Sequence, residues 1–183
     1  EVAIYMEDLL LPIHARNYSG KEYNNMMTNI RKCIELIFIS MAENGLLPNK
    51  KNNGKYVFHD ILVDNKGGIN TTWCSLILSG KEVKVGDKIR IESTNILPNV
   101  LKDSFQRLKE ISAAYEHTVN KNANEQQQKN SRQTPEFLES LGNPPYLLQS
   151  MTLELCNIIL WYANYLEEHD DEELNALNWN IIQ

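Results

Sequence analysis

The last long apolar segment of the chain is the feature that most limits its fold. Apolar side chains recur at helical spacing from Pro144 to Glu167 and form two stripes instead of one. The first stripe consists of Leu147, Leu148, Met151, Leu155, Ile158, Ile159, Tyr162 and Tyr165, and the second of Leu153, Cys156, Leu160 and Trp161. A single packing partner cannot cover both stripes. We therefore expect this helix inside a helical bundle or at a subunit interface, and the second stripe predicts a homodimer.

Two amphipathic helices are predicted upstream of this segment. The first begins at Ser19 and Glu22, which have the spacing of a capping box, and ends at Asn44-Gly45. Its single apolar face consists of Tyr23, Met26, Met27, Ile30, Cys33, Ile34, Ile37, Phe38 and Met41. The second helix begins at Leu97-Pro98. Its apolar positions are Leu101, Phe105, Leu108, Ile111 and Tyr115.

Between these two helices, apolar residues alternate with polar ones, which is typical of strands. Segments 55–64 and 69–78 flank the turn Asn65-Lys-Gly-Gly68 and predict a hairpin. Alternation around Gly86-Asp87 predicts two more short strands within residues 82–92.

These elements predict one domain over residues 1–183 with a mainly α (α+β) fold. The expected architecture is a helical bundle with a small antiparallel β insertion of three or four strands at about residues 55–92. Trp73 and Tyr56 on this insertion either pack a small sheet onto the bundle or form a surface for a partner.

Composition and charge narrow the classes of function. The formal net charge of -6 disfavours a nonspecific nucleic-acid binder, although a local basic patch remains compatible with it. Residues 120–133 contain nothing to bury and predict a mobile polar loop, and residues 167–173 form an acidic segment expected to be a solvated helix end. No apolar run reaches membrane-spanning length, so we expect no membrane association. Three widely separated cysteines predict reduced thiols and a cytoplasmic protein.

Motifs for phosphate, metal or covalent chemistry are missing from the sequence. Gly67-Gly68 lies in a predicted hairpin turn instead of between a strand and a helix, so it does not form a phosphate loop. The four histidines are dispersed, and none has the helical spacing of a metal site with another histidine or with a cysteine. They are His14, His59, His117 and His169. We therefore expect neither a metal nor another cofactor.

His117 is the candidate for general acid or base catalysis, because it lies in the last turn of a helix before a polar loop. The alternative is that it only complements the helix dipole. Ser112 and Glu116 are spaced so that they can reach the same region, and Tyr115 either binds a ligand there or packs in the core.

A long helix, a later helix ending in Ser112-Ala-Ala-Tyr-Glu-His117, a polar loop and a final Leu/Tyr/Trp-rich helix resemble the HEPN superfamily of bacterial defence and RNA-processing proteins. The resemblance covers residues 19–44 and 95–167. It implies a dimeric helical bundle with a metal-independent ribonuclease site, whose signature is an arginine followed by four to six residues and a histidine.

His117 matches the family histidine, but no arginine lies in the required window. The nearest upstream cations, Lys109 and Arg107, are outside the motif spacing, although a ribonuclease of this type needs a cation beside the histidine to stabilise the phosphorane. The resemblance therefore implies a degenerate catalytic motif.

Three functions remain open at this point. The first is a HEPN-like domain of a bacterial defence or RNA-related system that interacts with RNA or a nucleotide. The second is a non-catalytic protein-interaction or sensor domain with the same fold. The third is a small-molecule enzyme, but the sequence shows neither paired carboxylates nor a nucleophile and a base at a spacing typical of an active site.

Overall fold

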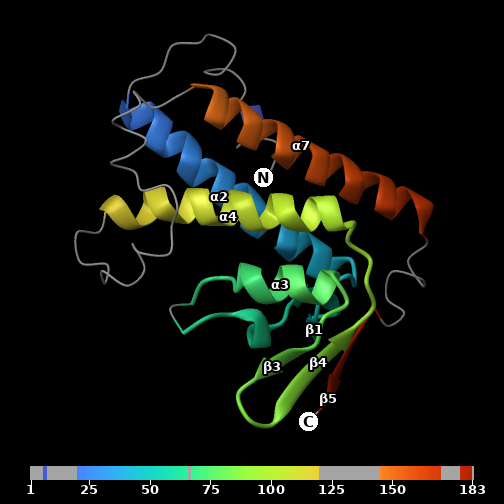
Figure 1. Cartoon of the computed structure of the whole chain (residues 1–183). Coiled ribbons are helices and arrows are strands. Elements are labelled where there is room, and N and C mark those ends of the chain that lie inside the picture. Colours follow the sequence, from blue (N-terminus) through green and yellow to red (C-terminus); the bar gives the residue numbers. More distant parts are fainter. Residues whose placement is uncertain (1–5, 8–19, 66, 120–144, 170–177, 183) are drawn as a thin grey trace. The chain divides into compact units, whose positions relative to one another are not determined.

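The protein has a mixed α+β fold (Figure 1). The computed structural model describes residues 6–7, 20–65, 67–119, 145–169 and 178–182. These residues contain four α-helices, one 3-10 helix and five strands. The chain divides into two compact units: Glu1–Ile34 with Gln106–Asn157, and Glu35–Phe105 with Ile158–Gln183. We call them unit 1 and unit 2. None of the described helices is long and apolar enough to cross a membrane.

Helix α2 (Gly20–Glu43) confirms the first predicted helix. All nine predicted apolar positions, from Tyr23 to Met41, are buried. The helix ends where Asn44-Gly45 predicted, because Gly45 has a φ of 82° and this left-handed conformation lets the Leu46 amide donate to the Met41 carbonyl at 2.9 Å.

The described part of unit 1 contains segments of three long helices. They are the first part of α2, the second part of α4 (Asn99–Val119) and the first part of α7 (Pro145–Glu168). Both α4 and α7 were predicted within about two residues of their observed bounds. Among the described residues of unit 1, the buried apolar side chains are Tyr23, Met26, Met27, Ile30, Cys33, Ile34, Leu108, Leu148, Met151 and Leu155.

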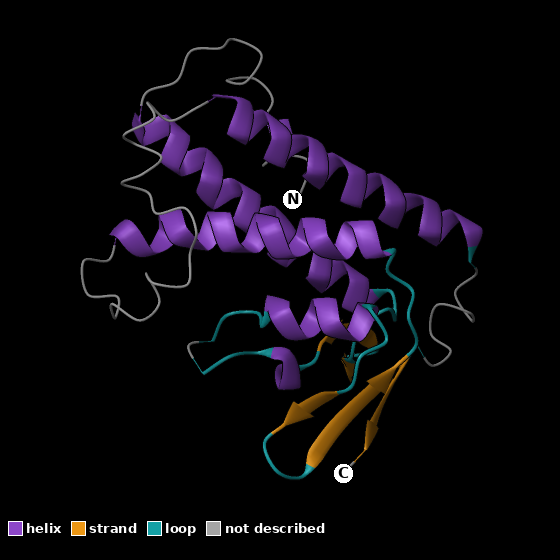
Figure 2. Cartoon of the chain, in the orientation of Figure 1, coloured by secondary structure: helices purple, strands orange, loops and turns teal. Residues whose placement is uncertain are grey.

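The five described strands all belong to unit 2 (Figure 2). Strands β1 (Asn49–Asn52) and β2 (Lys55–Phe58) form a two-stranded hairpin. Strands β3 (Val83–Val85), β4 (Ile89–Ser93) and β5 (Trp179–Ile182) form an antiparallel sheet in the order β3-β4-β5.

Helix α3 (Thr71–Leu78) packs beside this sheet. The Ser93 hydroxyl of β4 donates to the Ile77 carbonyl of α3 at 2.7 Å. This hydrogen bond ties α3 to the sheet, in which Val83 and Ile91 are buried. A short 3-10 helix, η1 (Asp60–Leu62), precedes α3 in the chain.

The predicted hairpin of segments 55–64 and 69–78 is wrong, because most of the second segment is helix α3. The turn itself exists: the Asp64 amide donates to the Gly68 carbonyl at 2.7 Å. The Asn70 side chain then accepts from the Trp73 amide at 3.1 Å and caps a helix. The buried positions of this helix, Thr71, Cys74, Ser75, Ile77 and Leu78, have helical spacing.

Other predictions about the strands had mixed outcomes. The two strands around Gly86-Asp87 are confirmed as β3 and β4, and Gly86 has the positive φ of 64° that their turn requires. Strands β1 and β5 were missed. The predicted mobile loop 120–133 and the part of the acidic segment after His169 lie outside the described residues.

Candidate functional site

The predicted catalytic residues lie on the second part of α4. The side chains of Arg107, Lys109 and Ser112 are described, and they belong to unit 1. Residues Tyr115, Glu116 and His117 belong to the helical backbone of α4, but their side chains lie outside the described set. The structure therefore shows what surrounds the two candidate cations.

Arg107 is paired with a carboxylate on α7. Its Nε donates to Oε2 of Glu154 at 3.0 Å, and its second guanidinium nitrogen forms an ion pair with Oε1 of the same carboxylate. Glu154 is only 9 % exposed, and the Ser150 hydroxyl also donates to its Oε1, at 3.4 Å. A two-pronged pair of this kind holds the guanidinium in one orientation. Arg107 is thus committed to Glu154 in this structure.

Glu154 was not among the site residues predicted from the sequence. Its position between Leu153 and Leu155, inside a stretch with no other charged residue until Glu167, is the available signal. A carboxylate at such a position needs a partner when it is buried. The sequence alone does not say which cation supplies it.

Lys109 is partly buried, and two other charged side chains, Glu110 and Arg31, act on its ammonium group. Burial lowers the pKa of its ammonium group, the charge of Glu110 opposes that shift, and the charge of Arg31 lowers the pKa further. Two cations of unit 1, one on α2 and one on α4, therefore influence each other electrostatically.

Ser112 is fully buried. Its hydroxyl donates to the Leu108 carbonyl at 2.7 Å and lies 3.3 Å from the Lys109 carbonyl, so it is used inside its own helix. Its role in the structure is packing and local hydrogen bonding.

His59, one of the two described histidines of unit 2, also has a local role. Its Nδ1 accepts from the Ile61 amide at 3.1 Å and caps η1. Burial lowers the pKa of His59, the Asp60 carboxylate opposes this shift, and the Lys50 ammonium lowers the pKa further. Among the described side chains, no three His, Cys, Asp or Glu residues are grouped as a metal ion would require.

The cysteines are free thiols in the structure. Cys33 and Cys74 are buried, and Cys156 is half-buried. Burial raises the pKa of Cys33 to about 11 and also raises the pKa values of Cys74 and Cys156. Thiols of this kind are poor nucleophiles, so these residues do not form a reactive cysteine site.

A shallow depression of about 230 Å³ lies on unit 2 between β4 and β5. Its lining consists of Glu92, Ser93, Thr94, Trp179 and Asn180. The Trp179 Nε1 donates to the Gly45 carbonyl at 3.1 Å, so the indole anchors β5 to the end of α2. The depression offers polar groups but no pair of acid and base.

No protein-family model, curated protein or solved structure matches the chain.

Proposed function

We propose that the chain is a HEPN-like domain of a bacterial defence or RNA-related system, which works in the cytoplasm as a homodimer, interacts with RNA and does not cleave it. The Arg107–Glu154 pair is the observation that supports the absence of RNA cleavage in this proposal. The nearest upstream arginine is outside the motif spacing, and its guanidinium is already held by a carboxylate.

Cleavage of RNA without a metal requires two groups at one phosphate. A histidine moves protons, and a cation stabilises the negative charge that develops on the phosphorane. Lys109 is the other candidate cation, and burial makes its charged form less favourable. Neither described cation has the position or the environment that this chemistry requires.

Support for the homodimer comes from α7. Leu153 is 66 % exposed and Leu160 is 60 % exposed, so two members of the second apolar stripe face solvent in the single chain. The other two members, Cys156 and Trp161, are half-buried. A second copy of the chain would remove this apolar surface from water.

The test is a cleavage assay on labelled single-stranded RNA in the presence of a chelator. We expect wild type to leave the RNA intact. Cleavage by wild type that is lost in His117→Ala would contradict the non-catalytic assignment. A matched variant can restore the signature. Glu110 is exposed, and Glu110→Arg places an arginine with six residues between it and His117, which the motif allows.

The resemblance predicts that Glu110→Arg gains cleavage and that Glu110→Arg/His117→Ala does not. Activity in the first variant alone would support the HEPN-like site, since the two differ only at the histidine. Equal activity in both variants would show that the added arginine acts elsewhere, which would count against the HEPN-like assignment.

The alternative is a non-catalytic protein-interaction or sensor domain. The exposed Leu153 and Leu160 favour it as well, because a different protein could cover them as effectively as a second copy. This alternative predicts that wild type does not bind RNA and that a protein partner tolerates His117→Ala.

A further inference from the structure

A basic segment without acidic residues lies between Glu43 and Asp60. It contains Lys50, Lys51 and Lys55, although the whole chain has a net charge of -6. All three lysines belong to the β1–β2 hairpin of unit 2. The hairpin therefore concentrates positive charge on one small element of an acidic protein.

The hairpin presents these side chains on a well-defined backbone. Its strands are joined by Asn53 and Gly54, whose φ values of 49° and 79° are those of a type I′ turn. The register pairs Lys51 with Tyr56 and Asn52 with Lys55. A tight turn of this type matches the twist of the strands and leaves little freedom at the tip.

One face of the hairpin combines a cation with an aromatic ring. The Lys51 Nζ lies 5.2 Å from the centre of the Tyr56 ring, and Tyr56 is 37 % exposed. On the other face, Lys50 forms an ion pair with Asp60 at the base of the hairpin, while Lys55 is exposed near the tip. Outside this ion pair, the exposed cationic and aromatic groups of the hairpin are Lys51, Lys55 and Tyr56.

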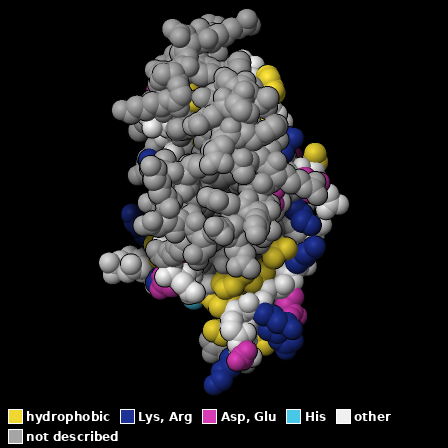
Figure 3. All heavy atoms as spheres, turned by 60° about the vertical axis from the view of Figure 1, so that its left-hand side comes forward, with side chains coloured by type: hydrophobic (Ala, Val, Ile, Leu, Met, Phe, Trp, Pro, Cys, Tyr) yellow, Lys and Arg dark blue, Asp and Glu magenta, His cyan; other side chains and the backbone are white. Residues whose placement is uncertain are grey.

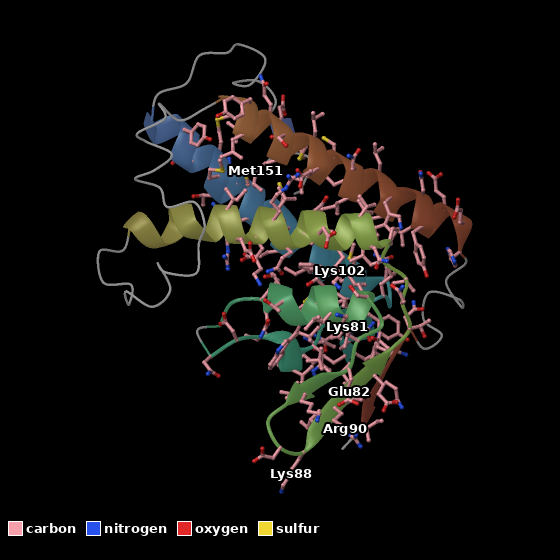
Figure 4. The ribbon with its side chains drawn as sticks, viewed as in Figure 1. Lys81, Glu82, Lys88, Arg90, Lys102 and Met151 are labelled. Atoms are coloured by element: carbon pink, nitrogen blue, oxygen red, sulfur yellow. The ribbon has the colours of Figure 1, made fainter. Side chains whose placement is uncertain are left out.

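The β3–β4 hairpin of the same unit provides a contrast. It also carries basic side chains, but Lys84 and Arg90 each lie 3.9 Å from a carboxylate oxygen of Glu82, and Asp87 precedes Lys88 in the turn. In Figure 4 the Glu82 and Arg90 side chains lie together, and Lys88 lies at the tip. At the lower end of Figure 3, where this hairpin lies, basic and acidic side chains are mixed.

We propose that the tip of the β1–β2 hairpin is the surface on which this protein holds single-stranded RNA, with the Tyr56 ring under a base and with Lys51 and Lys55, which lie on opposite faces of the tip, against phosphates. This inference rests on the proposed interaction with RNA and names where it occurs. Cations that contact the backbone, next to an exposed ring on which a base can stack, are the combination that single-stranded nucleic acid requires. An acidic protein segment would need the lysines but not the ring.

The experiment measures the fluorescence anisotropy of an end-labelled oligouridylate titrated with the full chain. The charge variant is Lys51→Gln/Lys55→Gln, and its matched control is Lys84→Gln/Lys88→Gln, which removes two lysines from the other hairpin. The ring variant is Tyr56→Ala, with Tyr56→Phe as the control that keeps the stacking surface. Melting curves of all variants verify that each is folded.

We expect Tyr56→Ala to weaken binding at least about tenfold, since stacking of a base contributes strongly to affinity, and Tyr56→Phe to stay within about twofold of wild type. We expect Lys51→Gln/Lys55→Gln to weaken binding and to reduce the slope of log affinity against log salt by about 1.4, as the loss of two phosphate contacts on a single strand requires. The β3–β4 control should change neither quantity by more than about twofold.

Contrary outcomes separate this inference from the proposed function. If wild type binds the oligouridylate and the hairpin variants bind equally well, the hairpin assignment fails and the interaction with RNA persists. If wild type does not bind it at all, both proposals fail. Equal losses in the two lysine pairs would indicate attraction by general charge and overturn the assignment. Loss with the lysines but not with the ring would also overturn it, because the Tyr56 ring would then not stack on a base.

Discussion

At the scale of single residues, the Glu154 carboxylate fixes the orientation of the Arg107 guanidinium. The carboxylate is nine-tenths buried, and the guanidinium is its two-pronged partner. Burial of a carboxylate without a cation is costly, so the pair contributes to the stability of unit 1 mainly by satisfying Glu154. The same bond holds the Arg107 guanidinium against α7.

Removal of Arg107 alone should therefore destabilise the protein more than removal of both charges. We expect Arg107→Ala to lower the free energy of unfolding by about 2 kcal/mol, because a buried carboxylate loses its partner. Arg107→Ala/Glu154→Gln should lose less than the sum of the two single variants. Urea denaturation of the four proteins measures this coupling, and strictly additive losses would show that the pair contributes nothing.

The candidate residues illustrate what sequence can predict at this scale. The spacing of His117, Lys109 and Arg107 along one helix was sufficient to show that the ribonuclease motif is incomplete. The engagement of Arg107 was not predictable, because Glu154 is 47 positions away in the sequence and the pair depends on how α4 and α7 pack. The burial of Ser112 was not predicted either.

At the scale of elements, long helices were predicted well because their apolar period extends over many turns. Helix α2, for example, shows nine buried positions on one face. Segment 69–78 was misassigned because a short apolar run fits a strand and a helix almost equally well, and the Asn70 cap decides the outcome. Strand β5 has only four residues, and it exists through pairing with β4. Pairing between positions so far apart leaves no local signal.

Gly80 fixes the connection between α3 and β3. It has a φ of 68°, and a Cβ at this position would lie 2.6 Å from the Asn95 backbone nitrogen, across the bridge between Ser79 and Asn95. Gly54 has a similar φ of 79° but open space around it. An alanine at Gly54 would have only the strain of the positive φ, whereas an alanine at Gly80 would also have the close contact with Asn95.

We expect Gly54→Ala to lower the free energy of unfolding by about 1–2 kcal/mol through backbone strain alone. Gly80→Ala should lose about 1–3 kcal/mol more, because the methyl group also displaces Asn95. Thermal melts of both variants followed by circular dichroism measure the difference. Equal losses would show that the contact with Asn95 relaxes without cost.

At the scale of the whole molecule, the two apolar stripes of α7 led to the prediction of a homodimer. In the described chain the first stripe is largely buried, with Leu148, Met151, Leu155, Ile158 and Tyr162 covered. Tyr162 also lies within hydrogen-bond distance of Ser40 and accepts from the Asn44 side chain, each at 3.0 Å, so this face is occupied within unit 2. Leu153 and Leu160 remain exposed.

If the second stripe forms the dimer interface, Leu153→Glu/Leu160→Glu should give a monomer with a melting temperature close to that of the monomeric state of wild type. Both positions are exposed in the single chain, so the charges disturb only association. Light scattering at several concentrations measures the mass. A monomeric wild type at high micromolar concentration would contradict the dimer, as would a dimer that persists in the variant.

The most direct test of the proposed function follows the anisotropy of a fluorescein-labelled oligouridylate over time after addition of the wild-type protein in a chelating buffer. An RNA-binding protein without a catalytic cation should raise the anisotropy to a plateau that remains constant, because the RNA is bound and stays intact. A signal that rises and then decays to that of short fragments would show cleavage and contradict the non-catalytic assignment. A signal that never rises would contradict the interaction with RNA.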